Sequence, residues 1–174
     1  MPLAPGFEEI EALTVVDIFR RAGIEILMAA TTEGPVTGRN NITVIPDALL
    51  NNVINDDYDM IVVPGGPGTA ELNQNSRIIA KIQQMNSSDK YIAAICAAPK
   101  VLKTAGIIAN KTVTSYPSTQ HELGGSHYVE DRVVIDGKII TSRGAGTSLE
   151  FALKLVEELL GKEMADQLAE SIVA

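Results

Sequence analysis

The stretch YIAAICAAPKVL, residues 91–102, places the only cysteine of the chain, Cys96, between two different patterns. The apolar run at 91–95 is typical of a buried strand, and the segment that begins at Pro99 is typical of a helix. We therefore predict a strand, a sharp turn and a helix. Such a turn presents a side chain at the carboxyl end of a sheet, beside the free N–H groups of a helix.

A cysteine at this turn has two readings. Free cysteine is among the most buried residue types and usually behaves as a small apolar group. Cys96 lies at the end of its strand instead of in the middle, where the positive end of the helix dipole favours thiolate over thiol. We therefore take Cys96 as the leading candidate for a nucleophile.

Strands and helices are expected to alternate on both sides of this unit. Apolar strands without polar alternation indicate a mostly parallel sheet with helices on both faces, an α/β fold. We expect one domain over residues 1–174. The first predicted strand ends at Ala4, and the others cover residues 24–30, 42–45, 58–63, 111–115 and the hairpin 132–135 with 138–142. The predicted helices cover residues 8–22, 49–54, 76–85, 147–160 and 162–173. Turns are predicted at residues 33–41 and 116–118.

In such folds the sites gather at the carboxyl ends of the strands. Glu11 lies on the buried stripe of the first predicted helix, where a carboxyl group tends to stay protonated and can donate a hydrogen bond to a thiolate. The alternative is that it complements the helix N-terminus.

Gly65 and Gly66 end a buried strand, and with the amide of Ala97 they would form an oxyanion hole; the alternative is that these glycines only make a tight turn.

The loop SRGAGT, residues 142–147, resembles the first half of a dinucleotide-binding loop. The position of the third glycine is Leu149, and no strand with a ribose-binding acid follows the helix. We expect a neutral turn in which Thr147 and Glu150 form a capping box.

Composition excludes several classes of function. The net charge of −8, without a basic run, makes nucleic acid an unlikely partner. No run reaches the roughly eighteen apolar residues of a membrane helix. The amino-terminal segment lacks a signal peptide pattern, so we expect a reducing cytoplasm. His121, His127 and one distant cysteine do not form a metal-ligand pattern, so neither a metal nor a cofactor is expected.

Five segments together resemble the ThiJ/PfpI superfamily, and within it the branch of the Parkinsonism-associated protein deglycase. They occur in order along essentially the whole chain, which makes the resemblance specific. The segments are GFEEIEA (6–12), DIFRRAG (17–23), VPGG (63–66), AICAAP (94–99) and TSRGAGT (141–147).

The resemblance implies a flavodoxin-like three-layer sandwich that forms a homodimer. Cys96 would be an oxidation-prone nucleophile and Glu11 its protonated partner, surrounded by the amides of Gly65, Gly66 and Ala97. The implied activity is cofactor-independent conversion of methylglyoxal or glyoxal, of the glyoxalase or deglycase type. The competing implication is a non-enzymatic sensor of oxidative stress, or a chaperone, in which Cys96 is oxidised.

Three positions depart from the family pattern. Tyr116 stands where glyoxalase members carry a histidine, and a phenol with a pKa near 10 is a poor base at neutral pH. Ala97 stands where peptidase members carry a histidine, so peptidase activity is not expected. Family members also begin several residues earlier, which places Met1 inside the first strand. Tyr116 and His121 are the side chains that we expect in the pocket around Cys96.

Overall fold

The strand that precedes the cysteine lies inside the largest sheet. In this computed structural model, which describes residues 1–174, four strands pair in the order β10-β11-β7-β6. β6 (Met60–Val63) and β11 (Ile139–Ser142) run parallel to β7 (Tyr91–Ile95) on either side, and β10 (Val133–Asp136) is antiparallel to β11. The predicted hairpin and the predicted strand before Cys96 are both confirmed.

The remaining strands are short. The strand Pro2–Leu3 (β1) lies against β6 without sharing a hydrogen-bonded ladder with it, so the sheet that contains β1 continues the layer of the first sheet. This second sheet is parallel and consists of β1 (Pro2–Leu3), β2 (Ala29–Ala30) and β5 (Ala48–Leu49). Two small pairs lie outside it: antiparallel β3 (Val36–Thr37) with β4 (Thr43–Val44), and parallel β8 (Thr112–Val113) with β9 (His127–Tyr128).

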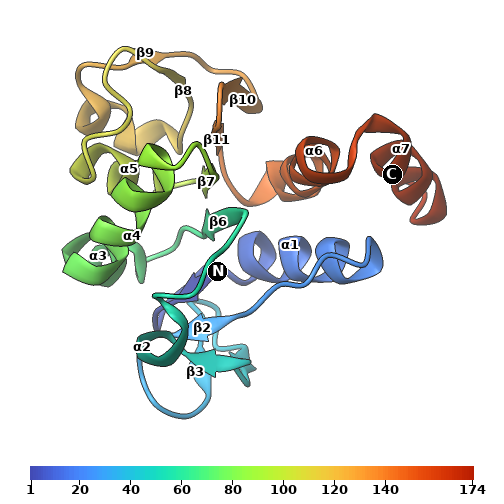
Figure 1. Ribbon diagram of the computed structural model, residues 1–174, viewed down its shortest axis with the longest axis horizontal. Helices are drawn as coiled ribbons and strands as arrows, with labels where there is room; N and C mark the ends of the chain where they lie inside the picture. Colours follow the sequence, from blue (N-terminus) through green and yellow to red (C-terminus); the bar gives the residue numbers. More distant parts are fainter.

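Helices cover both faces of the layer of strands (Figure 1). One face carries α1, α6 and α7, and the other carries α3, α4 and α5, while α2 lies beside β2 and β5. Their bounds are α1 (Glu9–Arg21), α2 (Leu50–Val53), α3 (Thr69–Gln74), α4 (Ser76–Ser87), α5 (Pro99–Thr104), α6 (Ser148–Leu160) and α7 (Lys162–Ser171).

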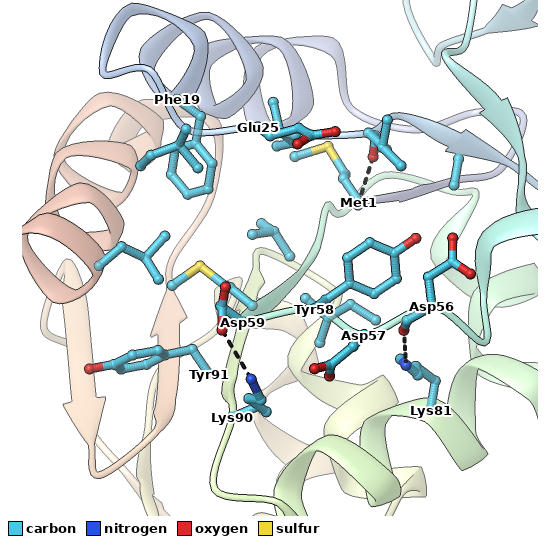
Figure 2. Close-up of a pocket in the computed structure, with 18 of the residues that line it drawn as sticks. Met1, Phe19, Glu25, Asp56, Asp57, Tyr58, Asp59, Lys81, Lys90 and Tyr91 are labelled. Carbon is cyan, nitrogen blue, oxygen red and sulfur yellow. Dashed lines mark hydrogen bonds and ion pairs between the residues drawn. The ribbon is translucent and has the colours of Figure 1, made fainter.

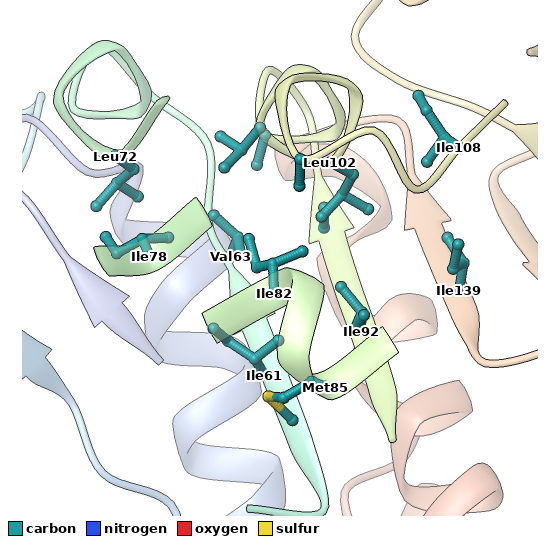
Figure 3. Packing of buried hydrophobic residues seen from close by; sticks show 14 of the residues in the cluster. Ile61, Val63, Leu72, Ile78, Ile82, Met85, Ile92, Leu102, Ile108 and Ile139 are labelled. Carbon is teal, nitrogen blue, oxygen red and sulfur yellow. The ribbon is translucent and has the colours of Figure 1, made fainter. Parts of the chain in front are cut away.

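Successive residues of the central strands enter opposite cores. Ile61 and Ile92 pack with the helices α3, α4 and α5 (Figure 3), whereas Val62, Ala93 and Ile95 pack with α1, α6 and α7. A strand with both faces buried needs apolar residues at every position, which explains the runs without polar alternation. The predicted α/β fold is confirmed, and no helix is long and apolar enough to cross a bilayer.

The strand predicted over residues 24–30 is wrong for most of its length. Only Ala29 and Ala30 pair, with Pro2 and Leu3 of β1 on one side and β5 on the other. The oxygen of Leu27 accepts the Met1 amino group at 2.9 Å, and the oxygen of Met28 accepts the N–H groups of Asp47 and Ala48, but residues 24–26 form no hydrogen bond with a neighbouring strand. A strand is defined by its partner, and apolar residues alone do not supply one.

Other local predictions also need correction. Part of the predicted turn at 33–41 is the strand β3, and helix α3 lies in a segment for which no helix was predicted. The capping box of Thr147 and Glu150 does not form. The Thr147 hydroxyl instead lies 2.6 Å from the Ser142 hydroxyl and donates to the carbonyl oxygen of Gly144 at 2.8 Å. These contacts close the loop itself, through the 3-10 turn 145–147 that precedes α6.

Candidate active site

Cys96 occupies a strained backbone position between β7 and α5. Its φ is +63°, a left-handed value that is uncommon for a residue other than glycine and costs free energy. Two hydrogen bonds hold it there: its N–H donates to the oxygen of Ser142 at 2.9 Å, and its carbonyl oxygen accepts the N–H of Tyr116 at 2.8 Å. The predicted strand, turn and helix are confirmed, and the turn is anchored by two other segments.

Glu11 lies on the buried side of α1, with 1% of its surface exposed. The N–H of Gly65 donates to its Oε2 at 2.8 Å, whereas Oε1 has no hydrogen-bond partner. Burial, the largest cause, raises the pKa of Glu11 to about 7 because a carboxylate loses its hydration there. Glu11 thus lies in the first turn of α1, as the alternative expected, but its hydrogen bond is made with another loop.

The neighbouring acids of α1 have different partners. The Glu9 carboxylate accepts the N–H of Asn40 at 2.7 Å, and Glu8 pairs with Arg39 at 3.3 Å. These contacts fasten the loop between β3 and β4 onto the start of α1. Of the three acids, only Glu11 is directed to the cysteine.

Gly65 is the point where Glu11 and Cys96 converge. A Cβ added at Gly65 would lie 2.5 Å from Glu11 Oε2, 2.7 Å from Cys96 Cβ and 3.1 Å from Cys96 Sγ. Gly66 has φ +88°, and a Cβ there would lie 2.5 Å from the oxygen of Gly6. Both glycines therefore permit close approach of the backbone, beyond the needs of a tight turn.

The pKa of Cys96 is raised to about 12, chiefly by burial and then by the negative charge of Glu11 and its hydrogen bond. The amides of Ala97 and Gly66 lower it by a smaller amount. The helix dipole, which we expected to favour the thiolate, does not decide the net pKa shift of Cys96, which is upward. Helix α5 has only six residues, and its dipole acts over a short range, so burial and the adjacent carboxylate outweigh it.

The two groups titrate as one unit. With pKa values of about 7 and about 12, the pair releases one proton near neutral pH and keeps the second until the solution is strongly alkaline. Between these values Cys96 and Glu11 share one proton and one negative charge. The Gly65 amide stabilises the charge on the carboxylate, and the amides of Gly66 and Ala97 stabilise it on sulfur.

Tyr116 lies at the edge of this site. A Cβ added at Gly144 would lie 3.4 Å from the Tyr116 ring and 3.8 Å from Cys96 Sγ, so these residues surround one point. Tyr116 is half exposed. His121 is exposed within the 3-10 turn η1 (Pro117–Leu123), and the structure gives its side chain no contact with the groups around Cys96.

Gly144 is a site residue that the sequence reasoning missed. It lies in the loop considered only as a neutral turn or a nucleotide-binding loop, yet this loop follows β11, the parallel neighbour of β7. Carboxyl ends of parallel neighbours meet at one edge of a sheet, and this was the available signal. No group of three or more histidine, cysteine or acidic side chains is arranged to hold a metal ion.

Known proteins resemble this chain over nearly its whole length. The model of the DJ-1/PfpI family matches residues 1–158. Drosophila melanogaster dj-1beta is 41% identical, with 98% of this chain and 94% of that protein covered; its crystal structure superposes with a TM-score of 0.96 and covers 99% of this chain and 95% of that one.

Two further relatives bear on the chemistry. A Caenorhabditis elegans protein named glutathione-independent glyoxalase DJR-1.2 is 39% identical over 92% of this chain and 87% of its own. The structure of oxidized DJ-1 from Toxoplasma gondii has a TM-score of 0.95 and 36% identity, covering 99% of this chain and 95% of that one.

Proposed function

This chain belongs to the DJ-1/PfpI family, and we propose that it converts small reactive carbonyls such as methylglyoxal and glyoxal to hydroxy acids through Cys96, without a bound cofactor. The observation that carries the proposal is the buried Glu11 carboxyl with a pKa of about 7, beside the only cysteine. A group that titrates at the working pH can both give and take a proton. The relative named as a glutathione-independent glyoxalase supports the substrate class.

The first step is addition of Cys96 to the aldehyde carbon. The thiol proton passes to the Glu11 carboxylate as the carbon–sulfur bond forms, and the carbonyl oxygen becomes an oxyanion. The N–H groups of Gly66 and Ala97, which lower the pKa of the sulfur, would stabilise that charge. Return of the proton from Glu11 to the oxygen yields a neutral hemithioacetal.

The second step moves a proton between the two carbons of the substrate. Glu11, again ionised, removes the C–H proton of the hemithioacetal carbon, and the resulting enediol accepts a proton at the former ketone carbon. The product is a thioester on Cys96, because the aldehyde carbon has been oxidised while the ketone carbon has been reduced. Attack by water then releases the hydroxy acid and restores the thiol, so no external oxidant or reductant is consumed.

Tyr116 sets the expected rate. It lies at the open edge of the site, where a histidine would offer a second proton carrier with a pKa near 6.5. With tyrosine in this position, Glu11 has to perform both transfers in sequence. We therefore expect turnover to be slow relative to enzymes that divide the two transfers between two groups.

The test is to incubate the protein with methylglyoxal in the absence of glutathione and to measure lactate. The wild type should form lactate, and Cys96→Ser, an isosteric variant with a much weaker nucleophile, should form none above the uncatalysed rate. An unchanged Tm shows that the variant is folded. Equal rates for the two proteins would exclude the proposed enzyme.

A second function has a separate observation in its favour. Cys96 is only partly buried, and the Glu11 carboxyl and two backbone N–H groups surround its sulfur. These donors suit a sulfinate, which peroxide forms from the thiol with consumption of two equivalents and release of two waters. The Toxoplasma gondii relative is known as a structure of oxidized DJ-1. We therefore propose oxidation of Cys96 as the competing, sensor-type function.

Intact mass spectrometry after mild peroxide treatment tests the sensor function. We expect a gain of two oxygen atoms, mapped to Cys96 by peptide analysis and reduced in Glu11→Gln. No gain of mass, or a gain confined to the methionines, would exclude the sensor function.

The homodimer also stays a prediction, and light scattering after size exclusion would test it by showing twice the mass of the chain.

A further inference from the structure

Gly144 leaves an unfilled point between Cys96 and Tyr116. Its φ of 161° and ψ of −167° describe extended backbone, which any residue adopts. A Cβ at this position would lie 3.4 Å from the Tyr116 ring, 3.8 Å from Cys96 Sγ and 3.9 Å from Cys96 Cβ, and these are ordinary contact distances. Neither the backbone nor the packing therefore requires glycine here, in contrast to Gly65 and Gly66. The missing side chain leaves room for a group of the substrate.

Both walls of this space are held by hydrogen bonds. The oxygen of Tyr116 accepts the hydroxyl of Thr119 at 2.8 Å and its N–H at 2.9 Å, while the Tyr116 N–H donates to the oxygen of Cys96 at 2.8 Å. The oxygen of Gly144 accepts both the N–H and the hydroxyl of Thr147 at 2.8 Å. A subsite whose backbone is already fixed loses little conformational freedom when a ligand binds.

The surroundings of this space favour an apolar group. The Tyr116 side chain is half exposed, and Ala97 and Ala145, which follow the cysteine and the glycine in the chain, carry only a methyl group. The guanidinium of Arg143 donates to the backbone oxygen of Glu130 at 2.8 Å and lies 3.6 Å from its carboxylate. Because this cation is already paired, it offers no free counter-charge to a substrate that carries a carboxylate.

We propose that Tyr116 and Gly144 form a subsite for a planar aromatic substituent on the carbonyl compound that Cys96 attacks, so that aryl glyoxals are favoured over methylglyoxal. This assignment rests on the proposed function. In a 2-oxoaldehyde the aldehyde carbon bonds to sulfur, and the ketone carbon next to it carries the substituent. The unfilled point is in contact with both the sulfur and the ring, so it directs that substituent onto Tyr116. Aromatic pairs stabilise each other beyond the area that they bury.

The first test measures mandelate formed from phenylglyoxal and lactate formed from methylglyoxal. The ratio of the two kcat/KM values should be about 2- to 10-fold lower in Tyr116→Leu than in the wild type, because leucine is apolar but has no ring. Tyr116→Phe keeps the ring and should retain the wild-type ratio. Comparing ratios cancels the different intrinsic reactivities of the two carbonyls. An equal ratio in Tyr116→Leu and wild type would overturn the aromatic subsite.

Alkylation of Cys96 tests the subsite without turnover. Phenacyl bromide and bromoacetone place a phenyl or a methyl group at the same number of bonds from sulfur as the two glyoxals do, and their rate ratio cancels the thiol pKa. This ratio should also be about 2- to 10-fold lower in Tyr116→Leu. Tyr91→Leu is the control, because Tyr91 begins β7, at the opposite end of the strand from Cys96, and lines a different cavity (Figure 2). An equal effect of both variants would overturn the proposal.

Gly144→Ala places a methyl group in the space assigned to the ring. It should leave the Tm unchanged, since the added Cβ meets only ordinary contacts, and it should lower the alkylation ratio. Gly146→Ala, in the same loop with no atom within 4 Å, should keep the wild-type ratio. A wild-type ratio in Gly144→Ala would overturn the assigned position of the substituent.

The two assays separate this proposal from the proposed function. Absence of product from both glyoxals, together with a lowered alkylation ratio in Tyr116→Leu, would exclude the enzyme and support the subsite. Product from both glyoxals, with the same ratios in wild type and Tyr116→Leu, would exclude the subsite and support the enzyme.

Discussion

Replacement of Glu11 by glutamine isolates the protonation of the buried carboxyl. Glutamine has nearly the same shape and keeps an oxygen that can accept the Gly65 N–H, which donates to Oε2 at 2.8 Å in the wild type. It resembles the protonated acid but cannot ionise. The variant should therefore match the wild type in stability where Glu11 is protonated and differ from it where Glu11 is charged.

The magnitude follows from the pKa of Glu11. Burial raises it from 4.5 to about 7, and one pKa unit corresponds to about 1.4 kcal/mol. Between these pH values the folded chain holds a proton that the unfolded chain has released, so the stability of the wild type falls as the pH rises. The free energy of unfolding of Glu11→Gln, relative to wild type, should thus increase by about 3 kcal/mol from about pH 4 to about pH 8.

Urea unfolding of both proteins at several pH values measures this difference. Glu33→Gln is the control, because Glu33 is exposed, and its difference from wild type should stay constant with pH. The comparison cancels the contributions of the other titrating groups. A Glu11→Gln difference that varies by less than about 1 kcal/mol over this range would refute the argument that burial dominates the site.

Three further perturbations address the site and the core. Gly65→Ala introduces a Cβ 2.7 Å from Cys96 Cβ, so it should lower stability by about 1–3 kcal/mol in urea unfolding and abolish lactate formation; Gly146→Ala, with no atom within 4 Å, should change stability by less than about 1 kcal/mol, and equal effects would contradict the packing. Tyr116→His should raise kcat for methylglyoxal at least about 10-fold in the lactate assay, because it adds a proton carrier beside Cys96; an unchanged kcat would show that Glu11 alone limits transfer. Phe151→Ala removes a fully buried ring between α6 and the sheet and should cost about 3–5 kcal/mol in urea unfolding, with a smaller loss indicating that the core relaxes around it.

The strand, turn and helix around Cys96 could be predicted because the sequence patterns that indicate them are local. The apolar run at 91–95, the small residues after it and Pro99 as a helix start are consecutive in the chain, and a strand–turn–helix needs no distant partner to be recognised. The placement of Glu11 on the buried side of α1 was also predictable, since helical periodicity alone determines which residues share a face.

The electrostatics of the site could not be predicted. A local argument from the helix dipole indicated a lowered thiol pKa, yet burial and the Glu11 charge raise it. Both causes depend on which groups lie near the sulfur in space, and Glu11 and Gly65 are distant from it in sequence. The same reason explains why Gly144 was missed.

By itself, the sequence determined the α/β class, the elbow at Cys96 and the buried face that carries Glu11, because periodicity and turn chemistry act over a few residues. Only the tertiary structure decided where strands end and which groups share a proton. Residues 24–26 have a strand-like composition but form no hydrogen bond with a neighbouring strand, and Cys96 and Glu11 become one titrating unit only where Gly65 lets them converge. Pairing, burial and electrostatic coupling are properties of neighbours in space, and a linear pattern does not contain them.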